Sequence, residues 1–284
     1  MPDIPQFKTQ NSEINTPEGQ PDPDQGHTPE WPSTPYSDEA RLEEPGWQEA
    51  CCIGLFGDCT VANELWPLAN RPEQHLAVRL RRAFPAQPFL IRNVAASGES
   101  AGDFLNWRIE PVVSALPRLD VAFIRYGIND RKQHGIAGCI ANLRQLCTRL
   151  QAQFAGVTLI IETGMWVDYP AHYLWDRNTP LASLYAAMAT FAAEAGIPLL
   201  DLFHLMQHET RRGNWDLRVR GLPTPEHTVL DDSFDAFYGE DAAFFTNIHP
   251  NSRGMGLIAA WEVALLRELF GETLDHDNHS ALRR

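Results

Sequence analysis

Four short segments, far apart in the chain, carry groups that can do chemistry. They are Gly-Asp-Cys-Thr at 57–60, Ala-Ser-Gly-Glu at 96–99, Gly-Ile-Asn-Asp at 127–130 and Thr-Asn-Ile-His-Pro-Asn at 246–251. Together they supply a thiol, turns with backbone N–H groups, a side-chain amide and an imidazole. A nucleophile, a base and donors for an oxyanion are the groups that acyl transfer needs. These residues predict such a site if the fold brings the four segments together.

The first three segments each follow an apolar run that is typical of a buried strand. Five such runs, short and partly β-branched, lie at 51–56, 89–94, 119–126, 157–162 and 197–201. Helical spacing of apolar residues occurs at 136–154, 181–191 and 257–269, with Gly196 and Gly271 as stop signals for the last two. This alternation predicts an α/β fold in which helices cover both faces of a parallel sheet. Ligands bind such sheets beyond the carboxyl ends of the strands, where we expect all four segments.

This set of segments resembles the SGNH (GDSL-type) hydrolase family over about residues 50–270. In that family a Gly-Asp-Ser block follows the first strand, a second block offers a glycine, the third reads Gly-x-Asn-Asp and the last reads Asp-x-x-His. The resemblance implies a flavodoxin-like, three-layer α/β/α fold with a five-stranded parallel sheet. It also implies ester hydrolysis, a chemistry that needs no cofactor or metal.

The sequence departs from the family at the nucleophile, because Cys59 stands where the family has serine. A thiol has an ordinary pKa of about 8.5, and a helix N-terminus or an imidazolium lowers it. The thiolate is a strong nucleophile that needs less help from a base than a hydroxyl does. Two interpretations stay open: Cys59 is a natural nucleophile, or it is an engineered replacement of the serine.

The second departure is Thr246, which occupies the place of the aspartate three residues before His249. In a triad that carboxylate orients the imidazole and stabilises the imidazolium. Either a nucleophile–histidine dyad operates, or a carboxylate comes from elsewhere. The candidates precede His249 in the chain and are Asp231, Asp232, Asp235 and Asp241.

The resemblance assigns the catalytic roles residue by residue. His249 would take the proton from Cys59, and the oxyanion would be held by the backbone N–H groups of Cys59 and Gly98 and by the amide of Asn129. We expect Asp58 and Asp130 to be structural. The other cysteines, which are Cys51, Cys52, Cys139 and Cys147, fall within a strand or on a helix face, and we expect them in the core.

Substrate contacts are expected from two long loops, near 165–180 and 206–245, since long loops in a compact domain are often binding loops. Aromatic rings there would suit a sugar ring, and arginines could bind a carboxylate or phosphate. The predicted substrate-binding residues are Trp166, Trp175, Arg177 and Trp215. Arg125, Arg218 and Arg220 are further candidates for binding an anion. A secondary core beneath the loops is the alternative for the aromatic residues.

Composition limits the partners. The formal net charge is −14, which disfavours nucleic acids and anionic membranes. Residues 1–46 hold nine of the 21 prolines and a charge of −8, which predicts a disordered arm. We expect an SGNH-hydrolase-like domain at 47–275 and a tail at 276–284. Five cysteines without a CxxC pair, and no signal peptide, indicate reduced thiols in the cytoplasm.

The resulting hypothesis is an ester hydrolase acting on a small-molecule ester, such as an acylated carbohydrate or metabolite. An acyltransferase on the same scaffold and a non-catalytic binding module with a degenerate site are the alternatives. The sequence leaves the oligomeric state open.

Overall fold

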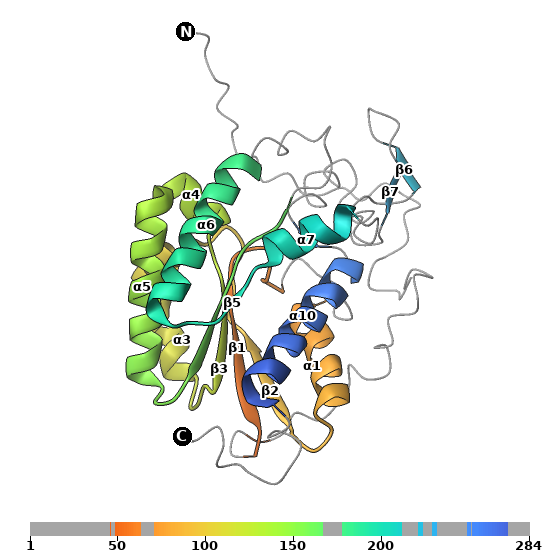
Figure 1. Ribbon diagram of the computed structural model, residues 1–284. Helices are drawn as coiled ribbons and strands as arrows, with labels where there is room; N and C mark the ends of the chain where they lie inside the picture. The colour runs from red at the N-terminus through yellow and green to blue at the C-terminus, as the bar shows by residue number, and fades with distance from the viewer. Residues whose placement is uncertain are drawn as a thin grey trace, which may run out of the picture.

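A five-stranded parallel sheet forms the centre of the protein, in the strand order β2-β1-β3-β4-β5 (Figure 1). The computed structural model describes residues 46, 49–63, 71–166, 178–211, 221–223, 229–231, 249–250 and 252–271. The strands are β1 (Cys51–Gly57), β2 (Phe89–Asn93), β3 (Val121–Arg125), β4 (Thr158–Glu162) and β5 (Leu199–Leu200). All five predicted strands and the flavodoxin-like order are therefore confirmed, although β2 and β4 are one residue shorter than their apolar runs and β3 and β5 are three residues shorter.

Helices cover both faces of the sheet, as Figure 1 shows with α5 and α6 on one side and α1 and α10 on the other. The main helices are α1 (Pro72–Ala83), α5 (Gly135–Gln153), α6 (Asn178–Ala195) and α10 (Ser252–Phe270). Gly196 and Gly271, which follow α6 and α10, have φ angles of 65° and 59°, which confirms them as stops. Shorter helices are α2 (Ala101–Asp103), the π-helix η3 (Phe104–Arg108), α3 (Ile109–Ala115) and α4 (Ile128–Gln133).

Each central strand contributes alternate residues to two separate cores, because successive side chains of a strand point to opposite faces. The core under α5 and α6 contains Phe56, Ile124 and Ile161. The core under α1 and α10 contains Leu55, Phe123 and Ile160. This two-sided burial explains why the strands read as continuous apolar runs in the sequence.

The segment 206–245 is not simply a long loop, which corrects the prediction. It begins inside helix α7 (Leu202–Arg211), whose Leu202, Phe203 and Met206 are buried while His204 is exposed. It also contains an antiparallel pair, β6 (Gly221–Pro223) and β7 (Val229–Asp231). The apolar face of α7 packs on the core under α10, so this part of the segment is a structural element.

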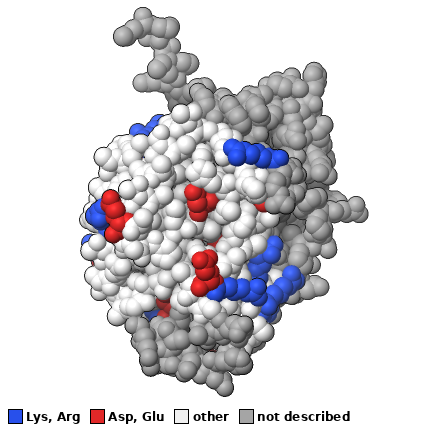
Figure 2. Space-filling view, in the orientation of Figure 1, with Lys and Arg blue, Asp and Glu red and all other residues white. Residues whose placement is uncertain are grey.

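Residues 1–45 and 272–284 lie outside the described residues, so the predicted arm at 1–46 and tail at 276–284 stay predictions. Every described helix is too short or too polar to cross a lipid bilayer. In the view of Figure 2, acidic and basic side chains both occur on the described surface, with large uncharged areas between them. The described part of this face therefore carries no large patch of a single charge sign.

Candidate active site

The turn after β1 is built around the buried carboxylate of Asp58. Its Oδ1 accepts hydrogen bonds from Thr60 N at 2.9 Å and Thr60 Oγ1 at 2.8 Å. Burial raises the pKa of Asp58 to about 6, although the hydrogen bonds from Thr60 act in the opposite direction. Asp58 therefore shapes the turn, as predicted, and Cys59 lies in the middle of it. All five cysteines are described, and Cys59 alone is partly exposed.

Backbone hydrogen bonds tie this turn to both neighbouring strands. Ala96 N donates to Gly57 O at 3.1 Å, and Asp58 N donates to Arg125 O at 3.4 Å. A Cβ atom on residue 57 would lie only 2.6 Å from Arg125 O. The close approach of β1 and β3 at this point therefore requires glycine at position 57.

The turns after β2 and β3 are joined by the side chain of Asn129. Its Nδ2 donates to the backbone carbonyl of Glu99 at 3.0 Å. Gly98, which directly precedes Glu99, is exposed and has a φ angle of 76°. This backbone conformation favours glycine. The structure thus brings the turns that contain Gly98 and Asn129 together, and an asparagine amide has a second N–H group that can also donate.

The side chain of Glu99 fixes the same turn from inside the protein. It is 7% exposed and accepts from Arg108 Nη1 at 3.0 and 3.1 Å and from Tyr126 Oη at 2.9 Å. Burial raises the pKa of Glu99, while the hydrogen bonds from Tyr126 and Arg108 oppose the rise. These contacts hold the backbone beside Gly98, and no sequence pattern pointed to them.

Asp130 is structural, as predicted. It is completely buried, and both of its carboxylate oxygens lie 3.1 Å from the backbone N of Ala101. Burial is the main cause of its raised pKa. Asp130 thereby links the start of α4 to the start of α2.

A Ser-His-Asp group lies nearby but forms a helix cap. Ser100 Oγ donates to Asp103 Oδ2 at 2.6 Å and lies 3.1 Å from His134 Nε2. Ser100 N also donates to Asp103 Oδ2, and Asp103 N donates to Ser100 Oγ, which completes a capping box. Because Ser100 is completely buried and donates to the carboxylate itself, it is not arranged as a nucleophile.

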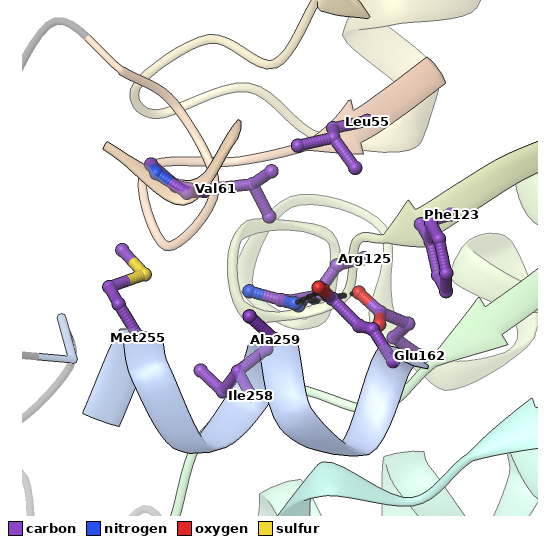
Figure 3. A pocket seen from close by; sticks show the side chains of 10 residues that line it. Leu55, Val61, Phe123, Arg125, Glu162, Met255, Ile258 and Ala259 are labelled. Carbon is purple, nitrogen blue, oxygen red and sulfur yellow. Dashed lines mark hydrogen bonds and ion pairs between the residues drawn. The ribbon is translucent and has the colours of Figure 1, made fainter. Parts of the chain in front are cut away.

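Arg125 is buried in an ion-pair cluster, so the prediction that it could bind a substrate anion is wrong (Figure 3). Its Nη2 lies 2.7 Å from Glu162 Oε2 and 2.9 Å from Glu262 Oε1. Its Nη1 donates to Thr60 O at 3.3 Å. Burial raises the pKa of both glutamates. No sequence pattern predicted this cluster, which contacts the turn that carries Cys59.

His249 is buried, with 3% of its surface exposed, and it lies three residues before α10. Met255 in the first turns of α10 and Val61 beside the Cys59 turn line one small cavity of about 10 Å³ (Figure 3). The beginning of α10 therefore lies against the end of β1. Thr246 and the candidates Asp232, Asp235 and Asp241 lie outside the described residues; for Asp231 only its place in β7 is described. The carboxylate that would orient His249 stays a prediction.

Trp166 is partly buried and packs against the protein core. Its indole meets the ring of Phe203 edge-on, with 5.3 Å between the ring centres. It contacts both cores as a partly buried residue, so its expected role in substrate binding stays a prediction. Three other predicted substrate residues, Trp175, Arg177 and Trp215, lie outside the described residues, as do Arg218 and Arg220.

The four remaining cysteines are core residues, as predicted: Cys51, Cys52, Cys139 and Cys147 are all buried. Burial raises the pKa of every one of these thiols. His204, a surface histidine on α7, pairs with Asp201 through an Nδ1–Oδ2 contact of 2.6 Å. Among the described residues, no cluster of metal-binding side chains is present.

Solved structures with the same architecture include several esterases. The acetyl xylan esterase AlAXEase is 13% identical with a TM-score of 0.54, and the match covers 76% of this chain and 99% of that one. The lipase/acylhydrolase from Enterococcus faecalis is 16% identical with a TM-score of 0.53, covering 77% and 96%. Axe2, an acetylxylan esterase from Geobacillus stearothermophilus, is 15% identical with a TM-score of 0.53, covering 81% and 99%. These likenesses support the fold.

No curated protein sequence matches the chain. A family profile does match it: that of the GDSL-like Lipase/Acylhydrolase family, over residues 55–257. This range includes the four segments that carry the predicted nucleophile, base and oxyanion donors. It also includes the Asp58 turn, the contact between Asn129 and Glu99 and the buried His249. The chain belongs to the GDSL-like lipase/acylhydrolase family.

Proposed function

We propose that the protein is a carboxylic-ester hydrolase that uses Cys59 as nucleophile and His249 as base. The observation that carries the proposal is the hydrogen bond from Asn129 Nδ2 to Glu99 O at 3.0 Å. It holds the amide of Asn129 beside Gly98 at the carboxyl edge of the sheet. The partly exposed thiol of Cys59, at the neighbouring strand end, supports the same arrangement.

In the first half of the reaction, Cys59 Sγ attacks the ester carbonyl carbon while His249 takes the thiol proton. The tetrahedral intermediate carries its negative charge on the former carbonyl oxygen. Three donors stabilise this oxyanion: the backbone N–H groups of Cys59 and Gly98, and the Asn129 N–H that does not face Glu99. One such donor contributes about 3 kcal/mol to transition-state stabilisation.

The intermediate collapses when the carbon–oxygen bond to the alcohol breaks, and His249 returns the proton to that alcohol. A thioester on Cys59 remains. Water then attacks the thioester carbonyl and gives a proton to His249, the carbon–sulfur bond breaks, and the thiol is restored as the acid leaves. His249 mediates every proton transfer in this scheme, and in the last step it passes the proton taken from water to the Cys59 sulfur.

The substrate class that we propose is a short-chain acyl ester of a carbohydrate. Two of the solved structures that share the fold are acetyl xylan esterases. The aromatic residues Trp166, Trp175 and Trp215, predicted to bind substrate, would suit a sugar ring. A small acylated metabolite offers the same ester bond. Arg177 would then bind a polar group of the substrate.

The test is hydrolysis of 4-nitrophenyl acetate and of an acetylated xylo-oligosaccharide by the wild type, Cys59→Ala, Cys59→Ser and His249→Ala. Turnover by the wild type and its loss in Cys59→Ala and His249→Ala are expected, with an acetyl adduct on Cys59 in the mass spectrum. His204→Ala, which changes an exposed histidine, is the control and should keep full activity.

The other candidate functions are outcomes of the same test. Turnover that rises when an alcohol or sugar acceptor is added would favour an acyltransferase. If neither the wild type nor Cys59→Ser hydrolyses any acyl ester and no adduct forms, the hydrolase proposal is wrong. The binding-module hypothesis then replaces it. A Cys59→Ser variant much faster than the wild type would identify the cysteine as a replacement of serine.

A further inference from the structure

The buried cluster of Arg125, Glu162 and Glu262 joins three elements that the proposed site depends on. Arg125 ends β3, Glu162 ends β4 and Glu262 lies on α10. Arg125 donates to Glu162 through Nε at 2.8 Å and to Glu262 through Nη2 at 2.9 Å. Its Nη1 reaches Thr60 O at 3.3 Å, in the turn that carries Cys59.

The cluster has one guanidinium for two carboxyl groups, and all three side chains are nearly inaccessible to water. The other residues that line the adjoining cavity are apolar: Leu55, Val61, Pro72, Phe123, Met255, Ile258 and Ala259. Two carboxylates beside one cation would leave a net negative charge in these surroundings, which is costly. A proton on one carboxyl group removes that charge.

The contacts indicate which carboxyl group holds the proton. Glu162 Oε2 accepts from both Nε and Nη2 of Arg125, which suits an ionised carboxylate. Glu262 receives only the Nη2 contact, through one oxygen, Oε1. The pKa of Glu262 is raised well above its ordinary value by burial and then by the charge of Glu162.

We infer that Arg125, ionised Glu162 and protonated Glu262 form a positioning cluster that fixes the Cys59 turn against α10, the helix that follows His249. This inference rests on the proposed function, in which Cys59 and His249 must meet. Reaction rates are sensitive to such placement, since a displacement of about 1 Å can cost about 100-fold in rate. None of the three side chains touches the substrate in this scheme.

Two isosteric variants test the cluster: Glu262→Gln, which resembles the protonated acid, and Glu162→Gln, which removes the ionised partner. We expect kcat of Glu262→Gln to stay within about 2-fold of the wild type, and kcat of Glu162→Gln to fall at least about 10-fold with KM nearly unchanged. Glu194→Gln, an exposed carboxyl group on α6, is the matched control. Equal kcat values for the two cluster variants, whether both normal or both reduced, would overturn the inference.

A second readout separates this inference from the proposed function. The rate at which iodoacetamide alkylates Cys59 reports the surroundings of the thiol without any turnover. It should fall in Glu162→Gln and stay unchanged in Glu262→Gln, even if the wild type hydrolyses no ester. If Glu162→Gln does not fold by circular dichroism, Arg125→Lys replaces it, because lysine cannot bridge both carboxyl groups and Thr60 O. An alkylation rate that is the same in all folded variants contradicts the cluster's role.

Discussion

The side-chain amide of Asn129 donates a hydrogen bond of 3.0 Å to the backbone carbonyl of Glu99. This contact joins the turn after β2 to the turn after β3. In the proposed mechanism both turns supply oxyanion donors, through Gly98 N–H and the second N–H of Asn129. Because the amide is already held in place, it needs little reorganisation when charge develops on the substrate.

Asn129→Ala should therefore lower kcat by about 100-fold, which corresponds to the loss of one oxyanion donor worth about 3 kcal/mol. The measurement is steady-state hydrolysis of 4-nitrophenyl acetate. Asn106→Ala, on the exposed side of η3, is the control and should leave kcat unchanged. If Asn129→Ala keeps more than half of the wild-type kcat while remaining folded, Asn129 is not an oxyanion donor.

Tyr126→Phe tests whether the side chain of Glu99 holds the Gly98 turn. The variant removes the 2.9 Å hydrogen bond from Tyr126 Oη to Glu99 Oε2. Hydrogen bonds to charged groups contribute about 1.5–3 kcal/mol, so the free energy of unfolding should fall by that amount in urea titrations. We also expect kcat to fall several-fold, because the donor at Gly98 is less firmly held.

The matched control is Tyr185→Phe. Tyr185 is also buried, but its hydroxyl makes no hydrogen bond with the residues that the structure describes. Its removal should leave stability unchanged or slightly higher. A loss of stability at position 185 as large as that at 126 would show that both effects come from packing and not from the hydrogen bond to Glu99.

The fold could be predicted from the sequence because both faces of the sheet are buried. Runs such as 51–56 and 159–161 are continuously apolar for that reason, and the helices between the strands keep a regular spacing of apolar residues. The predicted strand boundaries differ from the observed ones where burial ends. For example, β5 covers only Leu199–Leu200, whereas the predicted run is 197–201. Helix α7 (Leu202–Arg211) overlaps the predicted loop from residue 206 onward, and its exposed residues, which include His204, interrupt the apolar pattern there.

The buried charges could not be predicted. Arg125 ends a strand, where a cation facing a substrate and a cation paired inside the protein look the same in the sequence. Its partner Glu262 lies 137 residues away, on a helix whose apolar spacing gave no sign of a buried carboxyl group. The same holds for Glu99, whose contacts with Arg108 and Tyr126 depend on the π-helix and the end of β3.

Asp58→Asn should change how stability depends on pH. The pKa of Asp58 in the folded protein is raised from 3.8 to about 6 by burial, so the folded state binds a proton that the unfolded state has lost. The stabilisation is complete below about pH 4 and is lost as the pH rises to about 6, at about 1.4 kcal/mol per pH unit. The asparagine variant lacks this loss, so its stability relative to the wild type should rise by about 2.5 kcal/mol between pH 4 and pH 7.

Urea titrations of both proteins at pH 4, 5, 6 and 7 measure this difference. Glu194→Gln, which changes an exposed carboxyl group, should show a stability relative to the wild type that hardly varies with pH. A constant difference between Asp58→Asn and the wild type across this range would mean that Asp58 is ionised in the folded protein throughout.

Alkylation with iodoacetamide tests whether Cys59 is the reactive thiol of the folded protein. The other four thiols are buried, and burial raises the pKa of each, so at pH 7 they offer iodoacetamide neither access nor thiolate. We expect peptide mass spectrometry to find one label per folded chain, on Cys59. His249→Ala should slow this labelling several-fold, since an adjacent imidazole promotes thiolate formation, whereas His204→Ala should not. Labelling that is equally fast in His249→Ala would separate Cys59 from His249 and leave the thiol without its proposed base.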